Sequence, residues 1–381
     1  MHRERLKLGI LFNFQPSWMG GIIYIINIVK TLNFLDDEEK PAITLFYKPE
    51  LVKFLNEFDE YPYLKKVEYD YPSLVKGNVK SWLLRKNLFV SPLLKKYELD
   101  VIYPLQDYPV RTKTKVKLVS WSADFQNKHY PEFFTKKNLI GRHQRVNNAL
   151  KNTDNLVLSS HDAHKDLKHF FKVRDGINVH IYHFVSIIDK VEDVNMKELR
   201  AKYDLPDKYY IISNQFHRHK NHKVVLLALA KMKKMGIRIH LAMTGKMPDA
   251  SVSPYMGELH AIIDENKLND QISLLGIISR NDQLQLMRHS QAVIQPSLFE
   301  GWSTVIEDAR SLQVPVIASS LGVNIEQLGD DHGYFDPHNV DQLVEILKDY
   351  PERNMGDMLY DPYEKRVKEA AQTLMKILSP V

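Results

Sequence analysis

Two glutamates near the C-terminal end of the sequence bracket a glycine and two hydroxyl side chains. The segment reads SLFEGWSTVIEDARSLQVPVIAS, in which Glu300 and Glu307 lie on either side of Gly301, Ser303 and Thr304. The start of a helix presents free N–H groups and partial positive charge, and a glycine lets a ligand approach the backbone closely. The segment therefore predicts a phosphate site at the N-terminus of a helix.

The same residues also have a purely structural interpretation. Thr304 and Glu307 have the spacing of a capping box, in which the hydroxyl caps the helix and the glutamate reaches back to the N–H of the capping residue. Residues 314–318 then read as a buried strand entered through a proline. Under this interpretation Glu307 is structural, and Glu300 is a solvated acid in a loop.

A second group of polar residues, SNQFHRHKNHK, lies at a predicted junction between a strand and a helix. Arg218, Lys220 and Lys223 bring positive charge to the start of that helix, where they could meet a diphosphate. The structural alternative is a solvated basic turn, because loops are often charged.

Three histidines, His217, His219 and His222, occupy the same group. Imidazoles at this spacing can chelate a metal ion. Zinc sites often combine histidine with cysteine or a carboxylate, and neither lies nearby in the sequence. We therefore expect no metal ion at this position.

The composition limits the class of protein. At 381 residues the chain is long for one core, which predicts two domains. Hydrophobic residues make up 44% of the chain, yet no apolar run approaches the roughly 20 residues that span a bilayer. The chain has no cysteine, which excludes disulfides, thiolate metal sites and cysteine nucleophiles. Its N-terminal residues lack the features of a signal peptide, so we expect a cytoplasmic location.

Alternating strand and helix patterns predict an α/β fold with doubly wound sheets in both halves of the chain. In the first half, a strand is followed by Gly20 and Gly21 and then by an apolar-periodic helix over residues 22–35. The expected strands there span residues 6–14, 42–47, 101–103, 116–121 and 155–159. In the second half, strands are expected at 209–213, 238–244, 272–275 and 292–295, with a helix over 220–235.

This pattern predicts a Rossmann-like domain over residues 1–190 and a second over 191–362. The last helix, at about 363–378, can pack on either domain, including back on the first. Ligands of open α/β sheets bind at the carboxyl ends of the strands. We therefore expect Gly20 and Gly21 to face the segment 301–304 across a cleft between the domains.

Several segments resemble the GT-B glycosyltransferases, especially their large retaining group called family 4. PSLFEGWSTVIEDARSLQVPVIAS looks most specifically like the donor-site signature of that group, and NQFHRHKNHKVVLLAL is similar to another part of it. MGGIIYIINIVKTL resembles the N-terminal glycine loop, and DFQNKHYPEFFTKKN with LVLSSHDAHKDL resembles the middle of the acceptor domain. The resemblance implies an N-terminal acceptor domain and a C-terminal donor domain that face a cleft.

The resemblance also implies roles for the residues of the glutamate segment. Glu300 would contact hydroxyls of the donor sugar, and Glu307 would bind the two ribose hydroxyls. A carboxylate suits a vicinal diol because it can accept two hydrogen bonds at once. Ser303 and Thr304, beside Gly301, would lie where the diphosphate rests on a helix start.

Lys220 matches the lysine of the family pattern that binds the diphosphate, and Gly20 and Gly21 match the loop that closes over the donor. The family also has an arginine upstream of the lysine, where this chain has Asn214 or Gln215. Arg218 is the candidate to replace its charge.

Two further departures concern spacing and the acceptor side. Six residues separate Glu300 and Glu307, one fewer than in the usual pattern. Many members also carry a histidine–aspartate pair near the acceptor, where this chain has Ala123 and Asp124. Asp124 is therefore a candidate catalytic acid, and His129, five residues on, could compensate for the missing histidine.

The implied reaction is the transfer of a sugar, with retention, from a UDP- or GDP-linked donor to a glycan or lipid-linked acceptor of cell-surface polysaccharide synthesis. We find no convincing Asp-x-Asp motif of the kind that holds a divalent cation. We therefore expect a metal-independent enzyme without a cofactor, in which Lys220, Arg218 and a helix N-terminus stabilise the leaving diphosphate.

Two other functions fit less well. A GT-B-like sugar-nucleotide epimerase or hydrolase needs paired acids on the sugar, and rapid turnover of the donor without an acceptor would favour it. A basic nucleic-acid-binding protein would bind with a steep salt dependence, but the net charge of +5 is mild and no aromatic-basic motif supports it.

Residues 76–96 interleave apolar and basic side chains in the sequence KGNVKSWLLRKNLFVSPLLKK. A basic amphipathic surface of this kind can rest on a membrane. An ordinary packed helix with a solvated face is the structural alternative. A peripheral contact with the inner membrane would suit a lipid-linked acceptor.

Overall fold

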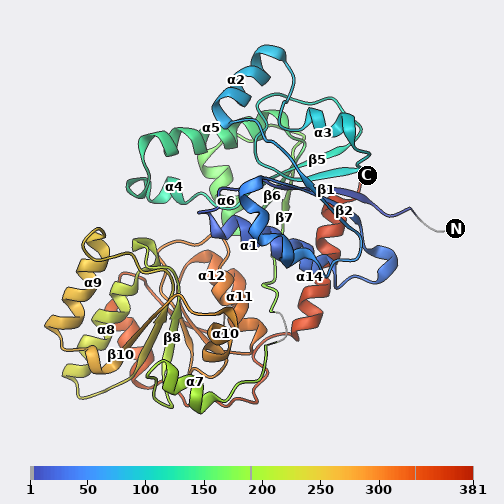
Figure 1. Ribbon diagram of the computed structural model, residues 1–381. Coiled ribbons are helices and arrows are strands. Elements are labelled where there is room, and N and C mark those ends of the chain that lie inside the picture. The colour runs from blue at the N-terminus through green and yellow to red at the C-terminus, as the bar shows by residue number, and fades with distance from the viewer. Residues whose placement is uncertain (1–3, 189–190, 331, 381) are drawn as a thin grey trace. The chain divides into compact units, whose positions relative to one another are not determined.

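The computed structural model describes residues 4–188, 191–330 and 332–380 of the chain (Figure 1). The chain divides into two compact units. Unit 1 consists of Met1–Ile187 and Glu364–Val381, and unit 2 of Ile188–Tyr363.

Unit 1 is built on a parallel sheet of seven strands in the order β3-β2-β1-β4-β5-β6-β7. The order changes direction between β1 and β4, so the sheet grows outward from its first strand on both sides. Its strands are β1 (Lys7–Phe12), β2 (Ala42–Tyr47), β3 (Leu64–Glu68), β4 (Val101–Leu105), β5 (Lys117–Ser122), β6 (Asn155–Leu158) and β7 (Asn178–Ile181).

Helical segments connect these strands, and the last helix of the chain returns to the same unit. They are α1 (Met19–Leu32), η1 (Asp37–Glu39), η2 (Pro49–Phe58), α2 (Leu74–Leu84), α3 (Ser91–Lys96), α4 (Gln126–His129), η3 (Pro131–Phe133), α5 (Lys136–Asn152), α6 (His161–Phe170) and α14 (Tyr363–Leu378). Within the described ranges, no helix has the length and apolar content needed to cross a bilayer.

Unit 2 has a parallel sheet of six strands in the order β10-β9-β8-β11-β12-β13. Here the order changes direction between β8 and β11. The strands are β8 (Tyr210–Ser213), β9 (Leu241–Thr244), β10 (Ile272–Gly276), β11 (Val293–Gln295), β12 (Val316–Ser319) and β13 (Gly333–Phe335).

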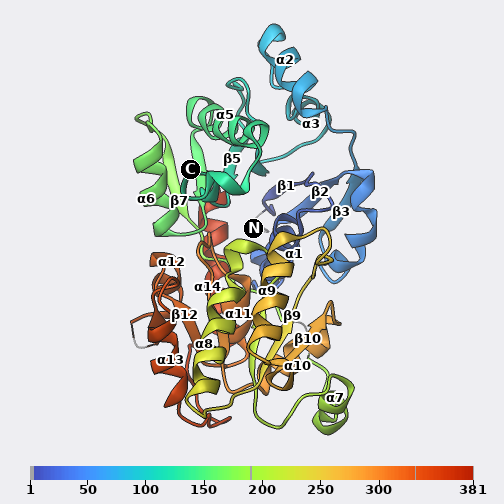
Figure 2. The same ribbon diagram turned by 90° about the vertical axis from the view of Figure 1, so that its left-hand side faces the viewer.

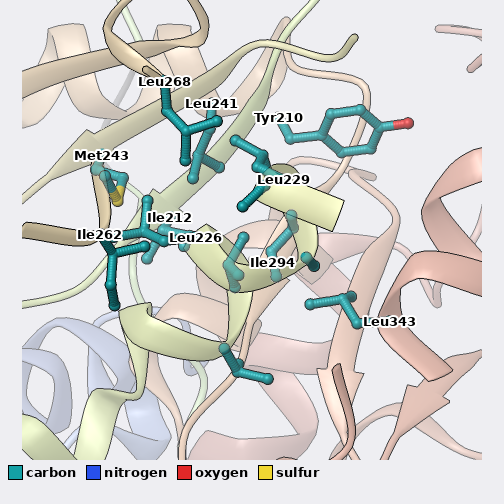
Figure 3. Close-up of a cluster of buried hydrophobic side chains, with 14 of the residues drawn as sticks. Tyr210, Ile212, Leu226, Leu229, Leu241, Met243, Ile262, Leu268, Ile294 and Leu343 are labelled. Carbon is teal, nitrogen blue, oxygen red and sulfur yellow. The ribbon is translucent and has the colours of Figure 1, made fainter. Parts of the chain in front are cut away.

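One core cluster of unit 2 lies between this sheet and helix α8, whose apolar side chains pack on β8 and β9 (Figure 3), and a second cluster includes apolar side chains of α10 and α11. Ile212, Leu226, Leu229, Leu241 and Met243 are all fully buried in the first cluster. The helical segments of the unit are α7 (Met196–Lys202), η4 (Arg218–Lys220), α8 (His222–Lys234), α9 (Pro254–Glu265), η5 (Asn269–Gln271), α10 (Arg280–Arg288), α11 (Thr304–Ser311), α12 (Gly322–Leu328) and α13 (Val340–Lys348).

The strands predicted from the sequence are present, with small shifts at their ends. Sequence patterns missed β3, β7 and β13, each of which forms an edge of its sheet. Edge strands are only half covered, so their short sequences lack the apolar runs that identify central strands. The helix expected over 220–235 begins later, at His222, because Asn221 adopts a left-handed conformation with φ 55°.

Gly245, which follows β9, allows two chain segments to cross at short range. Its φ is +143°, and a Cβ atom built on it would lie 2.2 Å from the carbonyl oxygen of Asn214. An L side chain has no room beside this backbone. The glycine therefore fixes the path of the segment after β8.

We expect Gly245→Ala to lower the free energy of unfolding by about 3 kcal/mol, because the backbone of Asn214 must move. Gly236→Ala is a matched control, since Gly236 also has a positive φ of +79° but no atom within 4 Å of an added Cβ. This control should cost only about 1–2 kcal/mol. Urea unfolding of both variants measures the difference, and equal losses would contradict the close approach.

His222 is part of the core of unit 2 rather than of a polar surface. It is completely buried at the first position of α8. Its ring stacks on Phe216 with centroids 4.2 Å apart. Burial, reinforced by the positive charge of Lys220, lowers the pKa of His222 from 6.5 to about 3. The folded protein therefore holds this imidazole neutral at physiological pH.

This shift makes stability depend on pH in a defined direction. Below pH 6.5 the unfolded chain protonates His222, whereas the folded chain does not until about pH 3, so acid favours unfolding. Between pH 7 and 5 the loss should be about 2 kcal/mol, and His222→Phe should remove it while keeping the ring stack. His260→Gln, at an exposed histidine of α9, is the control. Denaturant titrations at the two pH values measure this loss. A free energy of unfolding that falls as much in His222→Phe as in the unaltered protein would disprove the role of His222.

Candidate functional site

Two loops meet at the point where the sheet of unit 2 changes direction. Residues 214–221 follow β8 and residues 296–303 follow β11, and we call them the switch-point loops. The backbone N–H of Leu298 donates to the carbonyl of His219 over 2.7 Å. The side-chain amide of Asn221 donates to the carbonyl of Pro296 over 3.1 Å. Ligands of open α/β sheets bind at such a place.

An ion pair between Lys220 and Glu300 joins the same loops. Lys220 Nζ lies 2.6 Å from Glu300 Oε1, and the two side chains are only 19% and 9% exposed. Gln295 Nε2 donates to the same carboxylate oxygen over 2.7 Å. Asn214 Nδ2 in turn donates to Gln295 Oε1 over 2.8 Å. The side chain of Glu300 is thus held from two sides, and it is not the solvated loop acid of the structural interpretation.

The other cations of this group point to a different carboxylate. Arg218 lies 3.3 Å from Glu258 of α9, and Lys223 lies 2.5 Å from the other oxygen of Glu258. Arg218 also lies over the ring of Tyr255 at 5.3 Å. Sequence reasoning grouped Arg218 with Lys220, but the structure separates them, because their side chains leave the turn toward different acids.

Helix α11 begins beside Glu300, as the glutamate segment predicted. The capping residue is Ser303, whose Oγ accepts from the N–H of Ile306 over 3.3 Å. The predicted capping box at Thr304 is therefore wrong, since Thr304 is already the first helical residue. Gln327 of α12 accepts from the N–H of Ser303 and donates to its carbonyl.

Glu307 lies on the buried side of α11 rather than over its end. Its side chain is 1% exposed. Arg310 and the Nε2 of Gln327 both donate to its Oε1, each over 2.8 Å. In the structure the carboxylate links α11 to α12, and its role toward a ribose stays a prediction.

The remaining polar residues after β8 do not form a group of metal ligands within the described part of the chain. His217 bonds to the side chain of Gln215 over 2.9 Å and stacks on His219 with centroids 5.7 Å apart. Burial lowers the pKa of His217, with the charge of Lys220 adding to the effect. His222 is enclosed by the apolar core, which accounts for the third histidine without a ligand.

In unit 1, Gly20 and Gly21 lie in the first turn of α1, after β1. A Cβ on Gly21 would come within 2.7 Å of the ring of Trp18, so this glycine makes room for an aromatic side chain. Trp18 stacks on Trp121, which stacks on Tyr24 with centroids 4.1 Å apart. Gly21 thus has a packing role that the sequence did not reveal.

Asp124 and His129 each have a charged partner in unit 1. Asp124 Oδ1 lies 3.1 Å from Arg142 of α5 and also accepts from the N–H of Gln126. His129 Nε2 lies 2.9 Å from Asp166 of α6. The two candidate residues are therefore engaged separately rather than as a histidine–aspartate pair.

Gln295 and Gln327 are the residues of this site that the sequence did not indicate. Gln295 is completely buried at the end of β11, and Gln327 is 2% exposed. The only indication in the sequence that Gln295 belongs to the site is weak: it is a polar residue at the end of an apolar strand, next to a proline. Nothing in the sequence around Gln327 points to its contacts, which depend on how α12 packs against α11.

Comparisons with known proteins agree with this architecture. Residues 195–373 match the family model of the glycosyl transferases group 1. The putative glycosyltransferase EpsF of Bacillus subtilis is 31% identical over 105 residues, which are 28% of this chain and 25% of that protein. The match thus spans about a quarter of the length of this curated relative.

Solved structures share the fold over nearly the whole chain. Sucrose-phosphate synthase from Thermosynechococcus elongatus superposes with a TM-score of 0.65 at 14% identity, covering 98% of this chain and 96% of that one. HepE of Anabaena, solved in complex with UDP-glucose, superposes with a TM-score of 0.62 at 17% identity, covering 98% and 97%.

These neighbours are GT-B proteins, and their two parallel-sheet α/β domains correspond to the two units of this chain. The fold class expected from the sequence is confirmed. Most of the family match lies on the second unit, which carries the glutamate segment and Lys220, and its last ten residues lie on α14 of unit 1. Residues 195–373 of the chain thus match the glycosyl transferases group 1, and the fold of the whole chain is that of the GT-B glycosyltransferases that its sequence motifs resemble.

Proposed function

We propose that this protein transfers a sugar from a nucleoside diphosphate sugar to a glycan or a lipid-linked acceptor, with retention at the anomeric carbon and without a metal ion. The observation that carries the proposal is the Lys220–Glu300 pair beside the N-terminus of α11, at the switch point of the sheet. UDP is the first nucleotide to test as part of the donor, because HepE has been solved with UDP and with UDP-glucose. GDP is the second.

The proposed donor site uses both kinds of positive charge that the switch-point loops offer. The N–H groups at the start of α11 carry partial charge and suit phosphate oxygens. Lys220 carries a full charge on a side chain that is mostly covered, where Coulomb interactions are stronger than in water. We assign the diphosphate to these two groups and the sugar hydroxyls to Glu300.

Glu300 and Lys220 would act together in this scheme. The carboxylate holds the ammonium group in place, and Gln295 holds the carboxylate. Such preorganised charge stabilises a transition state without the cost of reorienting at the moment of reaction. Glu307 would bind the ribose, and Gln327 and Arg310 would fix its orientation.

In the proposed step, the bond between the anomeric carbon and the β-phosphate oxygen breaks, and the diphosphate leaves with the electron pair. The acceptor oxygen bonds to the same face of the carbon, and its proton passes to the departing phosphate oxygen. Charge grows on the phosphate during this step, so Lys220 contributes most in the transition state. Asp124 is proposed to act on the acceptor side. Polysaccharide synthesis at the cytoplasmic face of the membrane is the proposed setting, as the resemblance of the sequence motifs implies.

The proposal predicts that UDP or GDP binds in the presence of EDTA. Calorimetric titration should show one saturable site for one of the two nucleotides, and sugar transfer from the matching donor should continue in the chelator. Nucleotide at 100 times its dissociation constant should also stabilise the fold by about 2.7 kcal/mol. Activity that EDTA abolishes and one divalent ion restores would overturn metal independence. Failure of both nucleotides to bind would overturn the donor class.

Lys220→Ala should lower kcat by about a hundredfold or more, as the loss of one preorganised donor does in other enzymes, while donor KM changes less. Lys223→Ala is the matched control, because Lys223 lies three residues away but pairs with Glu258. The control should keep kcat close to that of the unaltered protein. Steady-state kinetics at saturating acceptor measures both constants. If Lys220→Ala weakens only donor binding, Lys220 is a binding residue and the catalytic charge lies elsewhere.

A further inference from the structure

Helix α2 has the reverse of the usual polarity for a surface helix. Its two buried residues are Gly77 and Ser81. A Cβ on Gly77 would lie 2.6 Å from the ring of Phe89, so the helix rests on the segment before α3 through its smallest side chains. Ser81 Oγ also accepts from the N–H of Leu88 over 3.0 Å. The face toward the protein is thus small and polar.

The outward face of α2 carries the large apolar side chains. Val75, Val79, Trp82 and Leu83 recur at the i, i+4, i+7 and i+8 positions of one helical stripe and are 71%, 53%, 70% and 65% exposed. Leu84 at the end of the helix is 63% exposed. In Figures 1 and 2, α2 stands at the outer end of unit 1, beyond α3. Contiguous apolar exposure of this kind marks an interaction surface.

The segment that carries this stripe is rich in positive charge and contains no acidic residue. Residues 71–97 contain six lysines and arginines and no aspartate or glutamate. They are Lys76 and Lys80 on α2, Arg85 and Lys86 after it, and Lys95 and Lys96 on α3. The positive charge of Lys95 lowers the pKa of Lys86, which shows that cations gather here.

We propose that α2 docks on a membrane surface that contains anionic lipid, with Val75, Val79, Trp82 and Leu83 entering the headgroup region and the surrounding cations meeting lipid phosphates. A stripe of aromatic and aliphatic residues beside lysines is the combination that binds helices in the plane of an interface. Each cation near such a surface adds to the attraction toward anionic lipid.

Charge argues against a second copy of this chain as the occupant. A symmetric contact would place the same cations of two molecules against each other, because each patch meets itself. Anionic headgroups instead supply the missing negative charge across a broad area. The surface does not depend on the proposed transfer reaction, although a lipid-linked acceptor would give it a use.

The test is co-sedimentation of the full chain with vesicles of phosphatidylcholine, with and without phosphatidylglycerol. We expect binding to the anionic vesicles that weakens with salt. Leu83→Glu and the pair Lys76→Glu with Lys80→Glu should each reduce the partition coefficient by about tenfold or more. Fluorescence of Trp82 should shift to the blue on binding. Trp82 is 70% exposed, whereas Trp18 is half-buried and Trp121 and Trp302 are buried.

Val52→Glu and Lys53→Glu are matched controls, because both residues are exposed on η2 of the same unit. These controls should bind vesicles as the unaltered chain does. Absence of vesicle binding, or equal loss in the controls, would overturn the proposal. The proposal would also be overturned if the chain did not bind vesicles but formed a concentration-dependent dimer that Leu83→Glu abolished. Titration of the same protein with UDP and GDP tests the proposed donor site separately from the membrane surface. Vesicle binding without nucleotide binding would contradict the proposed nucleotide-sugar donor but not the membrane contact of α2.

Discussion

The candidate site depends on the contact between the two switch-point loops. Adjacent parallel strands end side by side, and the reversal of strand order between β8 and β11 leaves their following loops next to each other. A backbone hydrogen bond from Leu298 to His219 and the Lys220–Glu300 pair close that contact. A covered ion pair is favourable only when its remaining hydrogen-bonding capacity is used, and Gln295 provides that second donor to the carboxylate.

Local pattern was sufficient to predict most strands and the helix start beside Glu300, because both depend on short-range periodicity and capping. Contacts between distant residues were not predictable in the same way. Lys220 and Glu300 are separated by 80 positions, and only the sheet order brings them together. The separation of Arg218 from Lys220 also depends on where α9 places Glu258. Sequence reasoning could assign the cations to one turn but not to their carboxylates.

The glutamate segment shows that structural and functional interpretations need not exclude each other. Ser303 performs the capping that the sequence assigned to Thr304, so the helix begins one residue earlier and Glu307 falls outside a capping box. Glu307 then turns inward to Arg310 and Gln327. A buried carboxylate with two donors is held rigidly, which is also what recognition of a diol requires. The bonds observed for Glu307 are structural, and its binding of the ribose stays a proposal beside them.

Helix α2 illustrates how a packing rule becomes informative when it is broken. Helix α8 follows the rule, since its apolar stripe covers β8 and β9, and the burial of Leu226 and Leu229 stabilises unit 2. In α2 the glycine and serine face inward, while Trp82 and Leu83 face water. Folding of the isolated chain gains nothing from this arrangement, because the apolar area stays hydrated. The exposed stripe and the cations of the same segment are therefore the two observations on which the proposed membrane contact rests.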